Sequence, residues 1–69
     1  MSPVTITHPN VLSAELQTDK DGKPFLEIMT DLRKDDDGFS AMTAAVEELR
    51  RQLPPHRRGD YVTYIPSGI

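Results

Sequence analysis

The chain has 69 residues, a net charge of −3 and no cysteine. A chain of this length forms one domain with a small core, which natural proteins often supplement with disulfides, metals or oligomerisation. The lack of cysteine excludes disulfides and thiolate metal sites, so oligomerisation is the remaining device. The mild negative charge argues against general nucleic-acid binding. We predict a single small domain over residues 1–69.

Membrane insertion and secretion both lack a signal in the sequence. No apolar run approaches the roughly 18 residues that a membrane-spanning helix needs. The first five residues, Met-Ser-Pro-Val-Thr, lack the basic and apolar regions of a signal peptide. We therefore expect a cytoplasmic protein that does not bind a membrane.

A first strand is predicted over residues 4–7, where every side chain is β-branched. Residues 11–18 and 24–32 follow as a hairpin, because apolar and polar side chains alternate along both segments. The turn between them has Asp19 at its first position and Gly22 at its fourth. This pattern is typical of a type I turn followed by a left-handed residue, which closes a three-residue loop.

This turn pairs Asp19 with Lys23 and thereby sets the register of the hairpin. One face is then apolar, with Leu16 opposite Leu26, Ala14 opposite Ile28 and Leu12 opposite Thr30. A two-residue loop would mix apolar and charged side chains on both faces, and we reject it. In the chosen register the other face carries Val11, Ser13, Glu15, Gln17, Phe25, Glu27, Met29 and Asp31.

An amphipathic helix is predicted after the charged connector of residues 33–38. Its apolar stripe recurs at spacings of three and four, and comprises Phe39, Met42, Val46, Leu49 and Leu53. Asp37 or Ser40 is available to cap its start. Pro54 and Pro55 end it.

A last strand is predicted over residues 60–65, but both its faces are partly apolar, so its orientation stays open. The predicted fold class is α+β. It is a small antiparallel sheet in the order β-β-β-α-β, with one amphipathic helix packed on one face. The opposite face is then left uncovered.

Apolar side chains on that uncovered face indicate a partner surface. Phe25 and Met29 stand where polar residues are expected, and Glu15 lies opposite Glu27, where like charges repel. A basic partner or an arginine of a second subunit would relieve this repulsion. Two other interpretations stay open: a few exposed apolar residues are normal, and a terminal segment could fold over the face. The predicted partner-binding residues are Val11, Glu15, Phe25, Glu27 and Met29, together with Arg57 and Arg58.

Two charged segments flank the helix. Five potentially basic residues gather at its end and in the following arginine loop (residues 56–58): Arg50, Arg51, His56, Arg57 and Arg58. They suit a phosphate or acidic-protein contact, or simply the negative helix end. The acidic connector, residues 35–37, matches a calcium loop only in part, because Arg33 and Ala44 occupy ligand positions.

Catalytic signals are poor. His8 and His56 lie far apart in sequence, and neither belongs to a nucleophile or metal motif. We expect no catalytic residues, no cofactor and no metal.

The favoured hypothesis is a non-enzymatic protein-interaction module that binds and modulates or inhibits a larger cytosolic complex. By analogy of class alone, phage-type inhibitors of host defence or regulatory assemblies are chains of this kind. The expected partner is a protein, and a homodimer is a second arrangement to test. The alternative is a small dimeric nucleic-acid-binding regulator that uses the arginine loop, which steep salt dependence of duplex binding would reveal.

Overall fold

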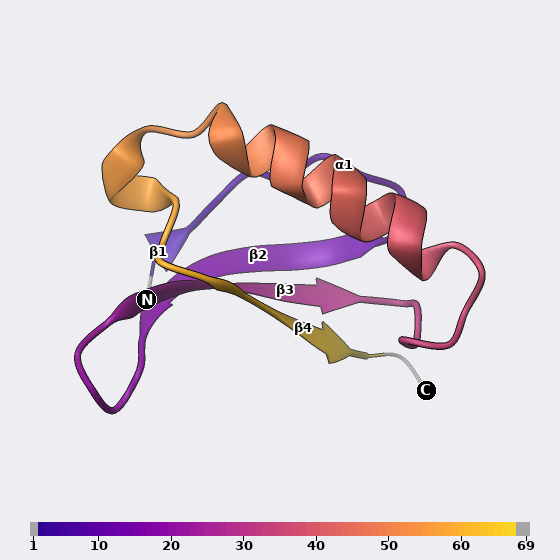
Figure 1. Cartoon of the computed structure of the whole chain (residues 1–69), viewed down its shortest axis with the longest axis horizontal. Coiled ribbons are helices and arrows are strands. Elements are labelled where there is room, and N and C mark those ends of the chain that lie inside the picture. The colour runs from indigo at the N-terminus through magenta and orange to yellow at the C-terminus, as the bar shows by residue number, and fades with distance from the viewer. Residues whose placement is uncertain (1, 68–69) are drawn as a thin grey trace.

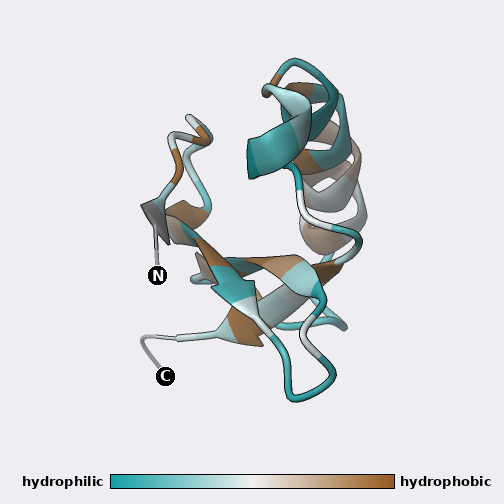
Figure 2. Ribbon diagram, turned by 90° about the vertical axis from the view of Figure 1, so that its left-hand side faces the viewer, coloured by the Kyte–Doolittle hydropathy of each residue, from teal (hydrophilic) through white to brown (hydrophobic). Residues whose placement is uncertain are grey.

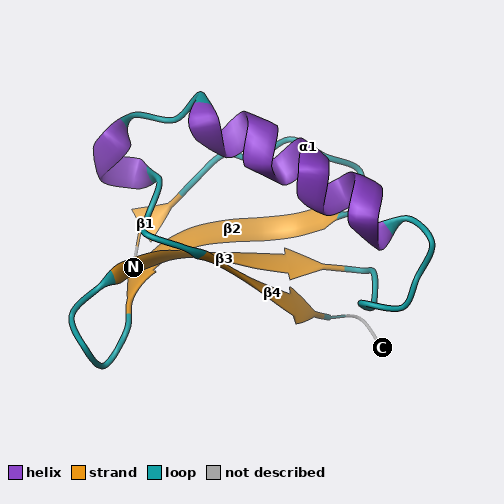
Figure 3. Cartoon of the chain, in the orientation of Figure 1, coloured by secondary structure: helices purple, strands orange, loops and turns teal. Residues whose placement is uncertain are grey.

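One helix lies across one face of a four-stranded sheet (Figure 1). The structure is a computed structural model and describes residues 2–67. The strands lie side by side in chain order: β1 (Ser2–Pro3), β2 (Val11–Thr18), β3 (Pro24–Thr30) and β4 (Val62–Pro66). The helix α1 (Phe39–Arg51) and a short 3-10 helix (Pro55–Arg57) connect β3 to β4 (Figure 3). The predicted α+β class and the β-β-β-α-β order are confirmed.

The hairpin of β2 and β3 has the predicted turn. The N–H of Asp19 donates to the carbonyl of Lys23 at 2.9 Å, and the N–H of Gly22 donates back to Asp19 at 3.0 Å. Gly22 has a φ of +82°, the left-handed conformation that this loop requires. Leu16 pairs with Leu26 as predicted, and Ala14 with Ile28.

The register changes at the start of β2, where a bulge lies between Val11 and Ser13. Val11, rather than Leu12, therefore pairs with Thr30. Val11 packs against the core, whereas Leu12 is 55% exposed. The predictions that Leu12 belongs to the core face and Val11 to the opposite face are wrong, because the extra residue of a bulge reverses the alternation beyond it.

The N-terminal segment differs from its prediction. The strand is Ser2–Pro3, which pairs with Leu16 and Glu15, and not residues 4–7. The next residues leave the sheet and rise on the same side as α1 (Figure 2). Val4 and Ile6 are buried there, so their β-branched side chains contribute to the core rather than to a longer strand.

The core fills the space between α1, the N-terminal segment and the sheet. Its buried apolar residues are Val4, Ile6, Ala14, Leu26, Ile28, Met42 and Val46. Phe39 and Leu49 of α1, and Leu53 just after it, are partly buried at the core edge. Gly38 occupies the N-cap position without a side-chain cap, so the prediction that Asp37 or Ser40 caps the helix is wrong.

Strand β4 runs parallel to β3, so the sheet is mixed rather than wholly antiparallel. The reason is the connection, since a helix between two adjacent strands is the crossover that parallel strands need. The parallel register sets Tyr64 beside Ile28 and Ile65 beside Met29. Tyr64 lies on the helix side, where its ring meets Phe39 edge-on with 5.5 Å between ring centroids.

The entry into β4 depends on Gly59. Its φ is +72°, and a Cβ built there would lie 2.9 Å from the N of Leu26 and 2.9 Å from the Cα of Phe25. Both contacts are with backbone atoms, which cannot move aside as a flexible side chain can. Only glycine therefore lets the chain approach β3 this closely.

Gly59→Ala should destabilise the fold more than Gly22→Ala. Gly22 also has a positive φ, but a Cβ there would meet open space. Alanine at Gly22 should cost about 1–2 kcal/mol of conformational strain. Alanine at Gly59 should cost at least ~1 kcal/mol more, because a backbone clash adds to the strain. Urea unfolding of both variants measures the difference, and equal losses would contradict the tight approach to β3.

Candidate functional site

The face of the sheet opposite α1, here the outer face, is the candidate site. The strand registers place on it Ser13, Glu15 and Gln17 from β2, Phe25, Glu27 and Met29 from β3, Thr63 and Ile65 from β4, and Tyr61 just before β4. In the views of Figures 1 and 2, α1 and the N-terminal segment lie on the other side of the sheet. Among residues 2–67, no helix covers the outer face.

Two apolar pairs stand on the outer face. The rings of Phe25 and Tyr61 are stacked, with centroids 5.3 Å apart and an interplanar angle of 9°. Met29 and Ile65 are register partners on β3 and β4. Tyr61 is 40% exposed, and the other three side chains are partly exposed. The face thus offers an ordered aromatic pair at the hairpin end and an aliphatic pair further along the same strands.

The aromatic pair is anchored by the hairpin turn. The hydroxyl of Tyr61 donates to Oδ2 of Asp19 at 2.7 Å. Oδ1 of the same carboxylate accepts the N–H groups of Asp21 and Lys23, both at 2.9 Å. One carboxylate therefore organises the turn and fixes the Tyr61 ring over Phe25.

This hydrogen bond shifts the pKa values of Asp19 and Tyr61 in opposite directions. The bond to Tyr61, followed by the backbone N–H of Lys23, lowers the pKa of Asp19 below 3.8. The bond to Asp19 raises the pKa of Tyr61 above 10.0, with smaller contributions from burial and from the charges of Asp19, Asp21 and Asp60. The bond stabilises the fold above the unfolded pKa of the aspartate and below that of the tyrosine. It is lost as the pH falls through the Asp19 pKa or rises through the Tyr61 pKa.

An acidic pair lies between the strands of the hairpin. Glu15 is opposite Glu27, as predicted. Nε2 of Gln17 donates to Oε1 of Glu27 at 3.0 Å, which satisfies one carboxylate oxygen. Within residues 2–67 the ion pairs join glutamates and arginines of α1, and neither Glu15 nor Glu27 takes part in one.

The arginine loop is bound to the chain itself. Arg58 donates from Nε to the carbonyl of Leu53 at 2.7 Å and from NH2 to that of Arg51 at 2.9 Å. Arg50 donates to the carbonyls of Arg58 and Gly59 at 2.9 and 2.8 Å. These bonds satisfy carbonyls at the end of α1 and hold the connection to β4.

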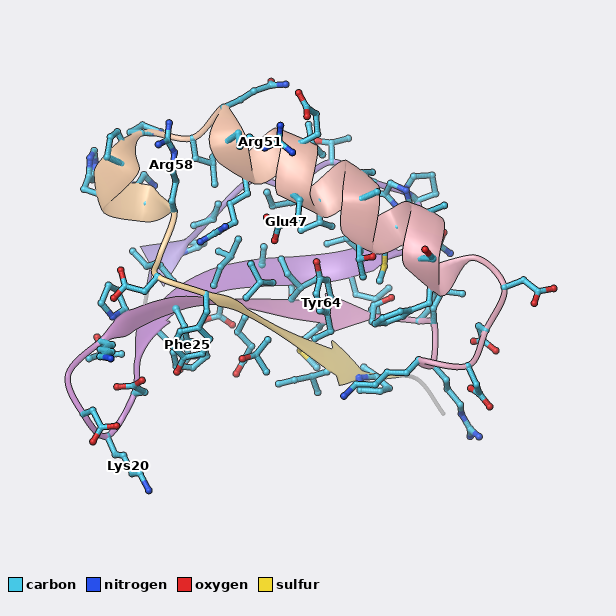
Figure 4. The ribbon with its side chains drawn as sticks, viewed as in Figure 1. Lys20, Phe25, Glu47, Arg51, Arg58 and Tyr64 are labelled. Atoms are coloured by element: carbon cyan, nitrogen blue, oxygen red, sulfur yellow. The ribbon has the colours of Figure 1, made fainter. Side chains whose placement is uncertain are left out.

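The structure does not bring the predicted partner-binding residues together on one surface. In Figure 4, Arg58 lies beside the end of α1, whereas Phe25 lies on the opposite side of the sheet. Arg57 donates to the carbonyl of Pro3 and so links the loop to β1. Val11 is on the core side. Of the predicted set, Glu15, Phe25, Glu27 and Met29 share the outer face.

Five outer-face residues were absent from the predicted set, and three of them, Gln17, Tyr61 and Ile65, make the contacts described above. Gln17 was on the correct face but was not singled out as a partner to Glu27. Tyr61 and Ile65 belong to the strand whose orientation stayed open. The helix before that strand was the available signal, since a helical crossover favours parallel pairing and thus sets which residues face outward.

The acidic connector lies at the end of the sheet remote from the hairpin turn (Figure 1). Its aspartates are exposed, and Asp36 accepts the N–H of Arg33 at 2.7 Å. In the described part of the chain, no group of three or more acidic or histidine side chains is placed to hold a metal ion. The described part of the chain also forms no pocket.

No protein-family model, curated protein or solved structure matches this chain. Among residues 2–67, no helix is both long and apolar enough to cross a membrane. The candidate site therefore rests on the geometry of the outer face.

Spectroscopic titration of tyrosine should detect the bond from Tyr61 to Asp19. The variant Tyr64→Phe leaves Tyr61 as the only tyrosine, because the chain has two. In that background Asp19→Asn should lower the pKa of Tyr61 towards 10.0, since its main cause is removed. Asp60→Asn is the control and should have a smaller effect. Equal shifts in the two variants would contradict a specific bond.

Arg58→Ala should destabilise the domain by about 1–3 kcal/mol, because it removes the charged donor from the partly buried carbonyl of Leu53 and from the exposed carbonyl of Arg51. Arg51→Ala removes the same charge from an exposed side chain that forms an ion pair with Glu48. It should change stability by no more than about 0.5 kcal/mol. Thermal and urea unfolding measure both values. A loss of stability as small for Arg58→Ala as for Arg51→Ala would show that the loop is merely solvated.

Proposed function

We propose that this protein is a non-enzymatic binding module that contacts a partner protein through its outer face. The observation that carries the proposal is the stacked pair of Phe25 and Tyr61 on a face that no described helix covers. Aromatic residues dominate the energetics of protein interfaces, especially near the centre of the contact. Met29 and Ile65 extend the apolar area beside them.

The anchoring of the aromatic pair supports this function. The hydrogen bond to Asp19 and the stack on Phe25 restrict the Tyr61 ring before any partner arrives. A side chain that is already ordered loses little conformational entropy on binding. The face is therefore suited to bind as a rigid surface, with little rearrangement of its sheet.

The charges of the outer face define the partner's chemistry. Glu15 and Glu27 face each other, and within residues 2–67 neither forms an ion pair with a basic side chain. A partner with an apolar centre and flanking arginine or lysine side chains would complement this arrangement. We propose that such binding modulates or inhibits a larger cytosolic assembly, in the manner of small inhibitors of phage or bacterial origin.

Nucleic-acid binding through the arginine loop finds less support. The side chains of Arg50 and Arg58 donate to carbonyls of their own chain, and Arg57 donates to Pro3. The net charge of −3 would also oppose approach to phosphates. Binding of duplex DNA at low salt, with steep weakening at moderate salt, would favour this alternative over ours.

Phe25→Asp and Ile65→Lys should each weaken partner binding while the fold persists. Both variants place a charge on the outer face, and Ile65→Lys leaves the aromatic stack in place. The matched control is Leu12→Asp, which removes an apolar side chain that is 55% exposed at the bulge of β2. Circular dichroism and thermal melts check that each variant is folded.

The binding test uses the wild-type chain as bait in a native lysate and then the purified partner. Phe25→Asp should weaken the affinity at least ~30-fold, which corresponds to the loss of about 2 kcal/mol at an aromatic hot spot. Leu12→Asp should bind as the wild type does. If folded Phe25→Asp and Ile65→Lys both retain full affinity, the outer face is not the binding surface.

A further inference from the structure

Strand β4 forms an open edge of the sheet, because it pairs with β3 on one side and with no described strand on the other. We propose that this edge pairs antiparallel with β4 of a second copy of the chain. The two sheets would then join into one continuous sheet. The proposal uses the edge of the sheet rather than its outer face, so it stands independently of the proposed function.

The backbone of β4 has groups that point away from β3. The carbonyl of Tyr61 accepts the N–H of Leu26 at 2.9 Å, and the N–H of Ser67 donates to Thr30 at 2.7 Å. Backbone groups alternate in direction along a strand. The N–H and carbonyl groups of Thr63 therefore point towards β3, as those of Tyr61 and Ser67 do. The N–H and carbonyl groups of Val62 and Tyr64 therefore point towards the open edge.

Among the described residues, Val62 and Tyr64 make no backbone hydrogen bond to a turn, loop or helix. Antiparallel pairing about a two-fold axis at Thr63 would set Val62 opposite Tyr64 of the second copy, and Tyr64 opposite Val62 of the second copy. Each such pair exchanges two N–H···O bonds. The open N–H and carbonyl groups of Val62 and Tyr64 would then all be satisfied.

The neighbouring residues select this register. An axis at Val62 would set Tyr64 opposite Asp60, whose N–H already donates to Pro24 at 2.8 Å. An axis at Tyr64 would set Val62 opposite Pro66, which has no N–H to donate. An axis at Thr63 avoids both losses, because it places Pro66 opposite Asp60 at the ends of the pairing. Pairing by β4 is thus limited in length and self-complementary, as a two-fold interface requires.

The side chains favour a second copy at the edge over a second copy on the outer face. No residue from Tyr61 to Ser67 is charged, so no like charges would meet along the edge. The register sets Tyr61 beside Ile65 of the second copy, which joins the apolar areas of the two outer faces. Stacking two outer faces would instead bring Glu15 and Glu27 against their own counterparts.

The edge arrangement keeps the acidic pairs apart. Glu27 lies on β3, so three strand spacings would separate the two copies of it. At ~4.8 Å for each spacing this is about 14 Å, which exceeds the screening length of about 8 Å at physiological salt. The opposite edge of the sheet, β1, has only two residues. Growth into a longer sheet is therefore disfavoured after one pairing.

Single-cysteine variants test the register directly, because the chain has no cysteine of its own. Thr63→Cys would place two thiols opposite each other at the axis, in a pair whose Cα atoms are about 4.5 Å apart. Ser13→Cys is the control, an exposed position on the outer face of β2. Under a glutathione redox buffer, Thr63→Cys should form the disulfide dimer at least ~10-fold faster than Ser13→Cys. Equal rates would overturn the proposal.

Light scattering provides a second readout without a cross-link. The wild type should show twice its chain mass of 7.7 kDa at high concentration. Thr63→Lys would place two ammonium groups opposite each other at the axis, and the measured mass should then be that of a single chain. Ser13→Lys carries the same charge on β2 and should remain dimeric. A folded wild type that stays at 7.7 kDa at millimolar concentration would overturn the proposal.

The same experiments separate this dimer from the proposed partner binding. Phe25 does not lie at the β4 edge, so Phe25→Asp should retain rapid cross-linking in the Thr63→Cys background. Loss of partner binding with intact cross-linking supports two separate surfaces. Loss of both in a folded protein would overturn the separation between the edge and the outer face.

Discussion

The parallel pairing of β4 with β3 is the interaction on which the rest of this structure depends. It brings Tyr61 over Phe25 and Ile65 beside Met29, so it builds the outer face. It also places Tyr64 against Phe39 of α1, on the core side. Parallel strands need a long crossover, and the ordering of that crossover costs conformational entropy.

Several specific contacts offset the entropy of the crossover. Gly59 permits the close approach to β3, while Arg50 and Arg58 bind the carbonyls of the last helical turn and of the following loop. At the other end, the buried hydroxyl of Thr30 donates to Sδ of Met42 at 3.0 Å and accepts the N–H of Leu32 at 3.1 Å. The crossover is therefore fixed where it leaves β3 and where it enters β4.

The hairpin and the helix could be predicted from the sequence because their signals are local. The Asp19 turn fixes the pairing of Leu16 with Leu26, and the stripe from Phe39 to Leu53 has one helical period. The bulge at Leu12 could not be predicted, since Val11 and Leu12 are adjacent apolar residues and the sequence does not show which of them faces the core. The first strand was misplaced because β-branched residues suit a buried extended segment as well as a strand.

The candidate site, like the fold, could be predicted from the sequence only where local signals determine it. Glu15, Phe25, Glu27 and Met29 follow from the hairpin register alone. Tyr61 and Ile65 depend on the direction of β4, which tertiary pairing decides. The structural role of Arg58 could not be predicted from the sequence, because nothing in the sequence distinguishes a solvated arginine in this loop from one that donates to carbonyls at a helix end.

The outer face stays open for a geometric reason. Four strands at ~4.8 Å spacing span about 14 Å between their axes, whereas a helix with its side chains is about 10–12 Å wide. One helix cannot cover such a sheet alone, so Val4 and Ile6 complete the same side as α1. The described chain then has no further apolar segment for the opposite side. Stacking Phe25 on Tyr61 reduces the apolar area in water but leaves Tyr61 40% exposed. Contact with another protein surface is the remaining way to remove that area from water.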